Sequence, residues 1–420
     1  MGGSRTYHDP LHGGITLHRD DPTEALLIQL IDSPEFQRLR RIRQLGPASL
    51  TFHGAEASRF THSLGVMQVA RRAFDALARS YGELLPHRTT VLCAAMLHDL
   101  GHGPFSHTCE DIFDSHHEDW TARILLESPP INRLLRAADA DLPEMIIATY
   151  RKHHALPLVS QLISSQLDCD RLDYLMRDSY YTGTSYGNLD LDRILAALRY
   201  DPKRRELVVA AKGQAAIEHY LIVRSLMYAQ VYNHPKNIAA AWGLNQAFRR
   251  ARELYLAGQL QTDSTLAAWL GQAPLGIEDY LAADDPVFNY HLQSWQRQGA
   301  GQPHQDPLLA DLSQRCVNRR LFKAKALGDL SADQQQDLLA QVQTVLAERG
   351  LSPTHYAGLE VAFSRGYQPY REGIRVQTPS GSREIGEVSP LIRALVQTRQ
   401  TTWLIYPRLI EGELQVLMED

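Results

Sequence analysis

The sequence VLCAAMLHDLGHGP occupies residues 91–104. Its first half is apolar on every side of a helix, which is typical of a helix buried in a helical core. His98 and Asp99 follow where that helix should end, because Gly101 and the Gly-Pro pair after it stop helices. A buried imidazole and carboxylate destabilise a fold unless both find partners, and a carboxylate at a helix C-terminus faces the negative end of the helix dipole. A bound cation removes both objections, so this stretch predicts a metal site.

Helical periodicity surrounds this stretch and dominates the first part of the chain, from about residue 22 to 260. The expected helices span residues 62–80, 89–100, 118–127, 158–179, 213–232 and 236–257. Residues 258–305 are richer in Gly, Pro, Gln and Asp, which indicates a partly irregular connector. A helix near 331–349 and alternating apolar segments follow it. We therefore expect a mainly α fold, with an all-α body over residues 1–260 and a smaller α+β portion over residues 261–420.

Composition restricts the class of protein. The 43 basic and 48 acidic residues give a net charge of −5, so the chain has no overall nucleic-acid footprint, although binding of nucleic acid stays open. Its four cysteines are scattered, which suits a reduced cytoplasm better than a disulfide framework. No signal peptide is recognisable and no apolar run approaches the roughly 18 residues of a membrane span. We expect a cytoplasmic protein that does not associate with membranes.

Histidines gather directly after the buried helix. Five of them lie within twenty residues, namely His98, His102, His107, His116 and His117. A single histidine is more often structural than functional, but this concentration at a helix end beside Asp99 favours a site. We expect His116 to be only a solvated neighbour of His117.

Two distant residues complete a metal shell with His98 and Asp99. His62 opens a helix whose apolar side should pack on the core, and Asp170 lies at helical steps from inward-facing apolar residues. An inward carboxylate needs a cation or several hydrogen bonds. Two histidines and two aspartates suit one borderline divalent ion such as Mn, Fe, Co, Ni or Zn. Four protein ligands do not fill an octahedral shell, so positions stay open for water and substrate.

Longer motifs carry a family resemblance over about residues 5–255. They read DPLHG at 9–13, PEFQRLRRIRQLG at 34–46, RFTHSLGV at 59–66, HDLGHGPFSH at 98–107 and DRLDYLMRD at 170–178. These motifs resemble the HD-domain deoxynucleoside triphosphate triphosphohydrolases, which include bacterial enzymes and the catalytic domain of the vertebrate SAM-and-HD-domain dNTPase. The resemblance implies an HD-domain helical core. It also implies a metal-dependent hydrolase that attacks the α-phosphorus of a dNTP and releases a deoxynucleoside and triphosphate, with Mg possible on the nucleotide.

The resemblance also assigns roles residue by residue. It makes His102, His107 and His117 acid or base candidates, with Glu110 orienting His107. The substrate-binding positions implied are Gln44, Leu45, Arg59, Arg171, Tyr174, Asp178, Arg224, Tyr232 and Asn233. Asp32, Gln37 and Arg40 match residues that bind a guanine nucleotide effector, GTP or dGTP, between subunits, which implies a homo-oligomer, with a tetramer favoured.

Two charged groups have ordinary structural interpretations. The arginine run of residues 38–43 would normally form a solvated helix face. Asp173 and Arg177 are expected to form an i,i+4 ion pair on an exposed helix face, worth tenths of a kcal/mol.

Two other functions stay open. The same fold could act on another nucleotide as a phosphomonoesterase or phosphodiesterase, which product analysis would distinguish. A non-catalytic nucleotide-sensing or single-stranded nucleic-acid-binding protein is the other alternative. The intact set of metal ligands disfavours it, because a binding protein needs no open metal position.

Overall fold

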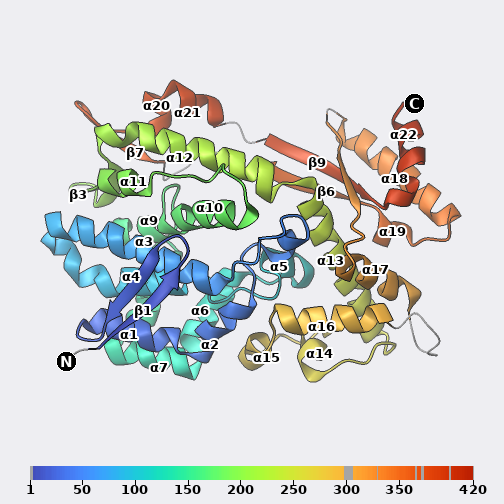
Figure 1. The fold of residues 1–420 in the computed structure, drawn as a ribbon, viewed down its shortest axis with the longest axis horizontal. Coiled ribbons are helices and arrows are strands. Elements are labelled where there is room, and N and C mark those ends of the chain that lie inside the picture. The colour runs from blue at the N-terminus through green and yellow to red at the C-terminus, as the bar shows by residue number, and fades with distance from the viewer. Residues whose placement is uncertain are drawn as a thin grey trace.

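The structure is a computed structural model that describes residues 3–297, 306–328, 330–364, 367–369, 373–396 and 399–419. Helices make up most of it and strands form three small sheets, so the predicted mainly α class is confirmed (Figure 1). Among the described residues, no helix has both the length and the apolar character needed to cross a bilayer.

The first part of the chain forms a helical body behind an N-terminal hairpin (Figure 1). Its elements are β1 (Ser4–Asp9), β2 (Gly13–His18), α1 (Pro22–Ile31), α2 (Pro34–Arg38), α3 (Arg59–Ser80), α4 (Arg88–Leu97), α5 (His107–Phe113), α6 (His117–Glu127), α7 (Pro129–Ala138), α8 (Leu142–Tyr150), α9 (Pro157–Ile163), α10 (Cys169–Thr182), α11 (Leu191–Ala197), β3 (Leu198–Asp201), β4 (Glu206–Val209), α12 (Gln214–Met227) and α13 (Pro235–Leu256). Short 3-10 helices cover Leu39–Arg41, Gly46–Leu50, Gly82–His87 and Ala211–Gly213, and a π-helical turn covers Tyr228–Tyr232.

The second part mixes helices and strands, as predicted. Its elements are α14 (Ser264–Leu270), α15 (Ile277–Leu281), α16 (Asp285–Gln296), α17 (Pro307–Val317), β5 (Lys323–Ala326), α18 (Ala332–Glu348), α19 (Pro353–Tyr356), β6 (Gly358–Ser364), β7 (Arg375–Thr378), β8 (Gly381–Glu384), α20 (Ile385–Val388), α21 (Pro390–Leu395), β9 (Arg399–Tyr406), the 3-10 turn Arg408–Ile410 and α22 (Glu411–Glu419). The predicted partly irregular connector over residues 258–305 contains three helices, α14, α15 and α16, with irregular segments between them, and its last residues, 298–305, lie outside the described residues.

The three sheets connect distant parts of the chain. Strands β1 and β2 form an antiparallel hairpin, and β6 and β5 both pair antiparallel with β9. The four-stranded sheet has the order β3-β4-β7-β8, in which Val209 of β4 pairs in parallel with Val376 of β7. The C-terminal part therefore supplies two strands to a sheet that begins in the first part.

The metal-ligand helices lie at the centre of the helical body. Helix α4 is fully buried from Val91 to Leu97 and ends there, as the sequence predicted. It packs on α3, which in turn packs on α10. The predicted helix over residues 158–179 is instead two helices, α9 and α10, because Asp168 caps α10 by accepting from the Arg171 N–H (2.8 Å).

A second apolar cluster spans the two parts of the chain. Phe105, Cys109 and Trp120 from the helical body are buried with residues of α13, α14, α16, α17 and α18. Residues 373–396, from the second part of the chain, pack on the core of the first part. Their side chains Val376, Ile385 and Ile392 are buried in the same cluster as α3 and α4. Figure 1 shows α20 and α21 above α12, far from α22. Each part of the chain thus contributes to the core of the other.

Candidate active site

Three elements bring the four predicted metal ligands together. His62 comes from the first turn of α3, His98 and Asp99 follow the last residue of α4, and Asp170 lies in the first turn of α10. His62 Nε2 lies 3.0 Å from Asp170 Oδ1 and 3.6 Å from Asp99 Oδ2. His98 Nε2 lies 3.3 Å from Asp99 Oδ1 and 3.6 Å from Asp170 Oδ1. His62, His98 and Asp99 have the spacing of a metal-binding group.

The imidazole nitrogens of His62 and His98 are arranged to bind a cation. His98 donates from Nδ1 to the Ala95 carbonyl (2.9 Å), which leaves the lone pair on Nε2. That Nε2 is buried and lacks a hydrogen-bond partner among the described residues. Burial lowers the pKa of His62, but its bonds to Asp170 and Asp173 outweigh burial and raise the pKa to about 10. The surplus of carboxylates thus draws positive charge into the site, and the two-nitrogen, two-oxygen donor set fits a borderline divalent metal.

Asp173 corrects the predicted exposed ion pair. Asp173 and Arg177 are both fully buried, and Arg177 Nε donates to Asp173 Oδ2 (2.7 Å). The same carboxylate accepts from Nδ1 of His62 (2.8 Å) and bonds His12 Nε2 (2.6 Å), while Arg177 also donates to Asp9 (2.9 Å). A carboxylate behind a metal-ligating histidine fixes the tautomer and orientation of the ring. Asp173 therefore orients His62 and leaves its Nε2 directed at the metal-ligand group.

Spacing alone did not reveal this supporting network, because its partners come from distant parts of the chain. One local signal was present: Gly65 lies three residues after His62, inside the long helix predicted over residues 62–80. A Cβ at Gly65 would collide with Asp173 and Arg177, so the glycine marks the close contact of α3 with α10.

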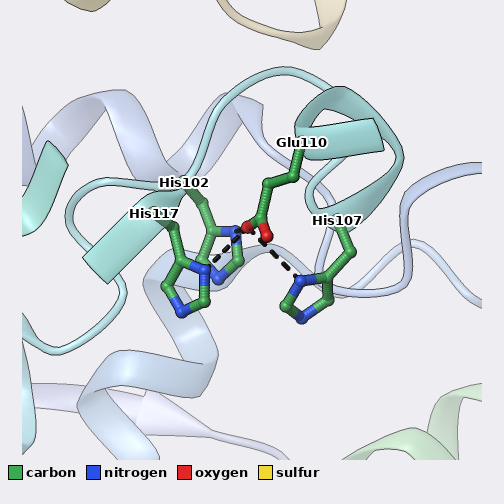
Figure 2. Close-up of side chains that lie close together, drawn as sticks. All are labelled: His102, His107, Glu110 and His117. Carbon is green, nitrogen blue, oxygen red and sulfur yellow. Dashed lines mark hydrogen bonds and ion pairs between the residues drawn. The ribbon is translucent and has the colours of Figure 1, made fainter. Parts of the chain in front are cut away.

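Four further predicted residues form a second cluster, drawn in Figure 2. Oε1 of Glu110 lies 2.7 Å from Nδ1 of His117, 3.3 Å from Nδ1 of His107 and 3.5 Å from Nδ1 of His102. The prediction that Glu110 orients His107 is therefore incomplete. Glu110 contacts both rings, and its shorter bond is to His117. Burial raises the pKa of Glu110, and the hydrogen bonds from His107 and His117 overcome that effect and lower it to about 2. His116 is exposed, as predicted.

One cavity of about 970 Å³ connects the two clusters. The predicted residues that line it are Gln44, Leu45, Arg59, His98, Asp99, His102, His107, His117, Asp170, Arg171, Tyr174, Asp178, Tyr232 and Asn233. Arg59 is buried, forms an ion pair with Asp99 and donates from Nε to Ser106 Oγ (2.8 Å). A cationic side chain therefore stands beside the metal-ligand group on the cavity wall.

Tyrosines and Asp178 line another part of the cavity. The Tyr232 hydroxyl donates to Asp178 Oδ2 (2.9 Å), and the rings of Tyr174 and Tyr232 meet edge to face at 6.0 Å. Asp178 Oδ1 is buried and has no hydrogen-bond partner within the described part of the chain. Burial raises the pKa of Asp178 to about 7, although the Tyr232 bond lowers it. This wall offers an unused acceptor next to an aromatic surface.

Two predicted phosphate-binding arginines differ in position. Arg171 lines the cavity, forms an ion pair with Asp168, and its buried Nε lacks a partner among the residues described. Arg224 is buried, donates to Gln166 Oε1 (2.9 Å) and is not among the described residues that line the cavity. The structure therefore brings Arg171 into the cavity wall but places Arg224 outside it.

The predicted effector residues lie on the surface near the start of α2. Asp32 pairs with Arg5 (2.6 Å), and Arg40 donates to Gln37 Oε1 (2.8 Å) while its guanidinium covers the Phe60 ring at 3.6 Å. The expectation of a solvated arginine run is wrong at Arg38, which is 2% exposed and donates to the carbonyls of His102 and Ala283.

Sequence reasoning missed two contributions from the second part of the chain. Asp285, at the start of α16, accepts from the backbone N–H of Phe105 (2.7 Å) and Arg43 (3.0 Å). Phe105 and Ser106 have φ of 59° and 57°, a conformation that needs external support. Residues 360–363 of β6 line the cavity, and the Phe363 carbonyl accepts from Asn233 (3.1 Å). Their partners are remote in sequence, so no local pattern indicated them.

Family models and curated relatives match most of the chain. A model of the HD domain matches residues 59–178, and a model of the HD associated region matches residues 189–268. The chain is similar to the uncharacterized protein YwfO of Bacillus subtilis, with 35% identity over 412 residues that cover 96% of this chain and 92% of that protein. It is also similar to the deoxynucleoside triphosphate triphosphohydrolase SAMHD1 of Danio rerio, with 28% identity over 80% of this chain and 58% of that protein.

Solved structures support the same grouping. A crystal structure of a phosphohydrolase from Bacteroides thetaiotaomicron matches with a TM-score of 0.82 and 29% identity, over 97% of this chain and all of that one. A hypothetical protein from Aquifex aeolicus matches with a TM-score of 0.76 and 27% identity, over 99% of this chain.

Proposed function

Because this chain belongs to the HD-domain phosphohydrolase family, we propose that it is a metal-dependent dNTP triphosphohydrolase. The observation that carries the proposal is the single cavity that joins the metal-ligand group, the cations Arg59 and Arg171, the histidine cluster and the tyrosine wall around Asp178. A triphosphate, a leaving oxygen and a deoxyribose need these features in one pocket.

Different residues of the cavity would bind the metal and stabilise the charge on the phosphates. His62, His98, Asp99 and Asp170 would hold a divalent ion, which supplies Lewis-acid polarisation of the α-phosphate and lowers the pKa of water. In the proposed reaction the oxygen of water bonds to the α-phosphorus and releases a proton to solvent, while the bond to the 5′-oxygen breaks and the 5′-oxygen takes a proton. Arg59 and Arg171 offset the charge on the phosphate oxygens.

The histidine cluster supplies that proton. His107 and His117 reach the cavity, and Glu110 accepts a hydrogen bond from each ring, which fixes the orientation of both. A positioned imidazole that donates to a leaving oxygen typically contributes about 10²–10⁴-fold in rate. Asp178 Oδ1 would accept the 3′-hydroxyl of the sugar, and the packing of Tyr174 would exclude a 2′-hydroxyl.

Product analysis tests the proposal. The metal-analysed protein is incubated with each dNTP and with Mn or Mg, with ATP and GTP as ribonucleotide comparators, and the products are separated by chromatography. We expect deoxynucleoside and tripolyphosphate from dNTPs and little turnover of ribonucleotides. Asp170→Ala should abolish turnover, and Asp192→Ala, at an exposed ion pair with Arg72, is the matched control. Release of phosphate or pyrophosphate would instead indicate a phosphohydrolase of another class, and binding without turnover would indicate a sensor.

We also propose that GTP or dGTP activates the enzyme through the surface around Asp32, Gln37 and Arg40, in a homotetramer. The paired carboxylate of Asp32 and the Arg40 guanidinium over Phe60 offer a hydrogen-bonding group and a cation at one exposed surface. Light scattering with and without GTP tests assembly. Arg40→Ala should remove any GTP-dependent gain in mass and rate, whereas a monomer at all GTP concentrations would contradict the proposal.

A further inference from the structure

We propose that His102, His107, Glu110 and His117 form a second divalent-cation site, separate from the His62–His98–Asp99–Asp170 group, and that an ion bound there inhibits the enzyme. The binding part stands on the geometry of these four residues alone. The inhibitory part rests on the proposed function, in which the same imidazoles deliver a proton.

The four donor atoms lie close together. One ligand atom from each residue lies within 4.8 Å of the others, and Figure 2 shows the three rings arranged around the Glu110 carboxylate. Tetrahedral ligands at bonds of about 2.0–2.2 Å stand roughly 3.3–3.6 Å apart. The separations of Glu110 Oε1 from Nδ1 of His107 (3.3 Å) and of His102 (3.5 Å) already have that spacing. The 2.7 Å bond to His117 must open, and the ring nitrogens, which lie within 4.8 Å of one another, must move to the same spacing.

His102 has the tautomer that a ligand requires. Its Nε2 lies 3.3 Å from Asp99 Oδ1, so the ring proton sits on Nε2 and the lone pair on Nδ1. His102 is 1% exposed, and its Nδ1 lacks a hydrogen-bond partner among the residues that the structure describes. A buried lone pair without a donor is destabilising unless something occupies it. A carboxylate bonded to the far nitrogen is also the usual arrangement behind a metal-ligating histidine.

The backbone and ring contacts hold His102 in this orientation. Arg38 donates to the His102 carbonyl (2.8 Å), and the His102 ring stacks on that of His117 at 3.9 Å with an interplanar angle of 11°. His107, by contrast, has a side chain that is 68% exposed, so it can adjust to an ion without disturbing the core. Because the in-plane lone pairs of two parallel rings cannot meet at one ion, the His117 ring must turn out of the stack when an ion binds. The site therefore combines one positioned ring with two that adjust.

The ligand set determines both the ion and its effect. Three imidazole nitrogens and one carboxylate oxygen suit a borderline ion, with Zn²⁺ the best match to a four-coordinate site. Four protein ligands leave no open position for substrate, which is the property of a closed site rather than a catalytic one. An ion in this site would occupy Nδ1 of each ring and so keep the ring from becoming a doubly protonated imidazolium. The proton on the opposite nitrogen is then too weakly acidic to be delivered to the leaving oxygen.

The first test measures stoichiometry. The metal-free chain is titrated with Zn²⁺ against a chromogenic chelator, so that weak surface binding is excluded. We expect two tight ions per chain in the wild type and one in His117→Ala. His116→Ala removes an exposed neighbouring histidine outside the cluster and should retain two. Asp170→Ala should keep the ion of the second site, and Asp170→Ala with His117→Ala should bind none tightly.

His107→Ala is a second variant that should fold normally, because the His107 side chain is largely exposed. It should weaken the second ion at least about 100-fold, the upper end of the effect of removing even an outer-shell partner of a metal site. A wild-type chain that binds one ion, with His117→Ala unchanged, would overturn the site.

The second test measures inhibition. With Mn²⁺ saturating the first site, micromolar Zn²⁺ should slow dNTP hydrolysis by the wild type and by His116→Ala alike. Two bound ions without any inhibition would overturn the regulatory role and keep the site. A chain that hydrolyses no dNTP would contradict the proposed function, while the stoichiometry would still decide whether the site exists.

Discussion

Asp173 is the residue on which the orientation of His62 depends. It is fully buried and bonds both His62 Nδ1 and the Arg177 guanidinium. We predict that Asp173→Asn lowers the affinity for the divalent metal about 10–100-fold, since the amide supports the ring less well. Removal of the charge also leaves Arg177 short of a partner, which we expect to destabilise the fold by about 3–5 kcal/mol.

Metal content after dialysis against graded chelator, together with urea unfolding, checks this prediction. Asp192→Asn, which alters an exposed ion pair, is the control. An Asp173→Asn protein with wild-type metal affinity would show that His62 is oriented by other contacts.

Asp285 should make the stability of the fold depend on pH. Burial raises its pKa from 3.8 to about 6, although two backbone N–H bonds lower it. The folded state therefore holds this proton more tightly than the unfolded state. The resulting stabilisation is complete below about pH 4 and is lost as pH rises through 6, by about 3 kcal/mol in total.

We predict that Asp285→Asn, which cannot ionise, gains about 2.5 kcal/mol relative to the wild type between pH 4 and pH 7.5. Paired urea unfolding curves at the two pH values measure that double difference. A difference that is constant with pH would show that Asp285 is ionised throughout this range.

Individual residues show what the sequence could reveal. That four candidate metal ligands come together was predictable because each carries a local signal, such as an apolar helix that ends in His98 and Asp99. The burial of Arg38 and of the Asp173–Arg177 pair was not predictable, since their partners His102, Ala283, His12 and Asp9 are distant in the chain. Helical spacing reports which residues share a face but does not report which face is covered.

At the scale of elements, the contact of α3 with α10 positions the metal ligands. Gly65 makes that contact possible, because an added Cβ would meet Asp173 and Arg177. We predict that Gly65→Ala destabilises the fold by about 1–3 kcal/mol, through overpacking, and also weakens metal binding by displacing α10. Thermal unfolding and metal analysis measure the two effects.

Gly82→Ala is the matched control, since a Cβ there meets nothing within 4 Å. A Gly65→Ala protein as stable as Gly82→Ala would mean that the two helices can separate without loss.

The boundaries of elements were less predictable than their existence. Helices α3, α4, α6 and α13 lie close to the expected positions, because each has a long apolar stripe. The division of residues 158–179 was missed because Val159, Ile163 and Gln166 continue the helical spacing across it. The decisive feature is the Asp168 side chain, which accepts from the N–H groups of Ser165 and Arg171 and starts a new helix.

At the scale of the whole molecule, the predicted boundary at residue 260 stays a prediction, but the two parts share their cores. We predict that a chain of residues 1–260 fails to give a stable fold. Phe105 and Trp120 would lose the apolar partners supplied by α14 and α16, and β4 would lose its partner β7. Circular dichroism melting and dye binding to exposed apolar surface, each against the intact chain, check this. A monodisperse fragment with a cooperative transition would contradict it.

The parallel pairing of Val209 with Val376 has a consequence for biosynthesis. Strand β4 leaves the ribosome long before β7, with which it pairs. During that interval, roughly ten seconds or more at ordinary elongation rates, the nascent helical body has an open sheet edge and uncovered apolar side chains. Open edges of this kind favour misassociation between chains. Successful production of the protein therefore depends on protection of this intermediate, and slower translation or a lack of chaperones should reduce yield before it reduces the activity of the molecules that do fold.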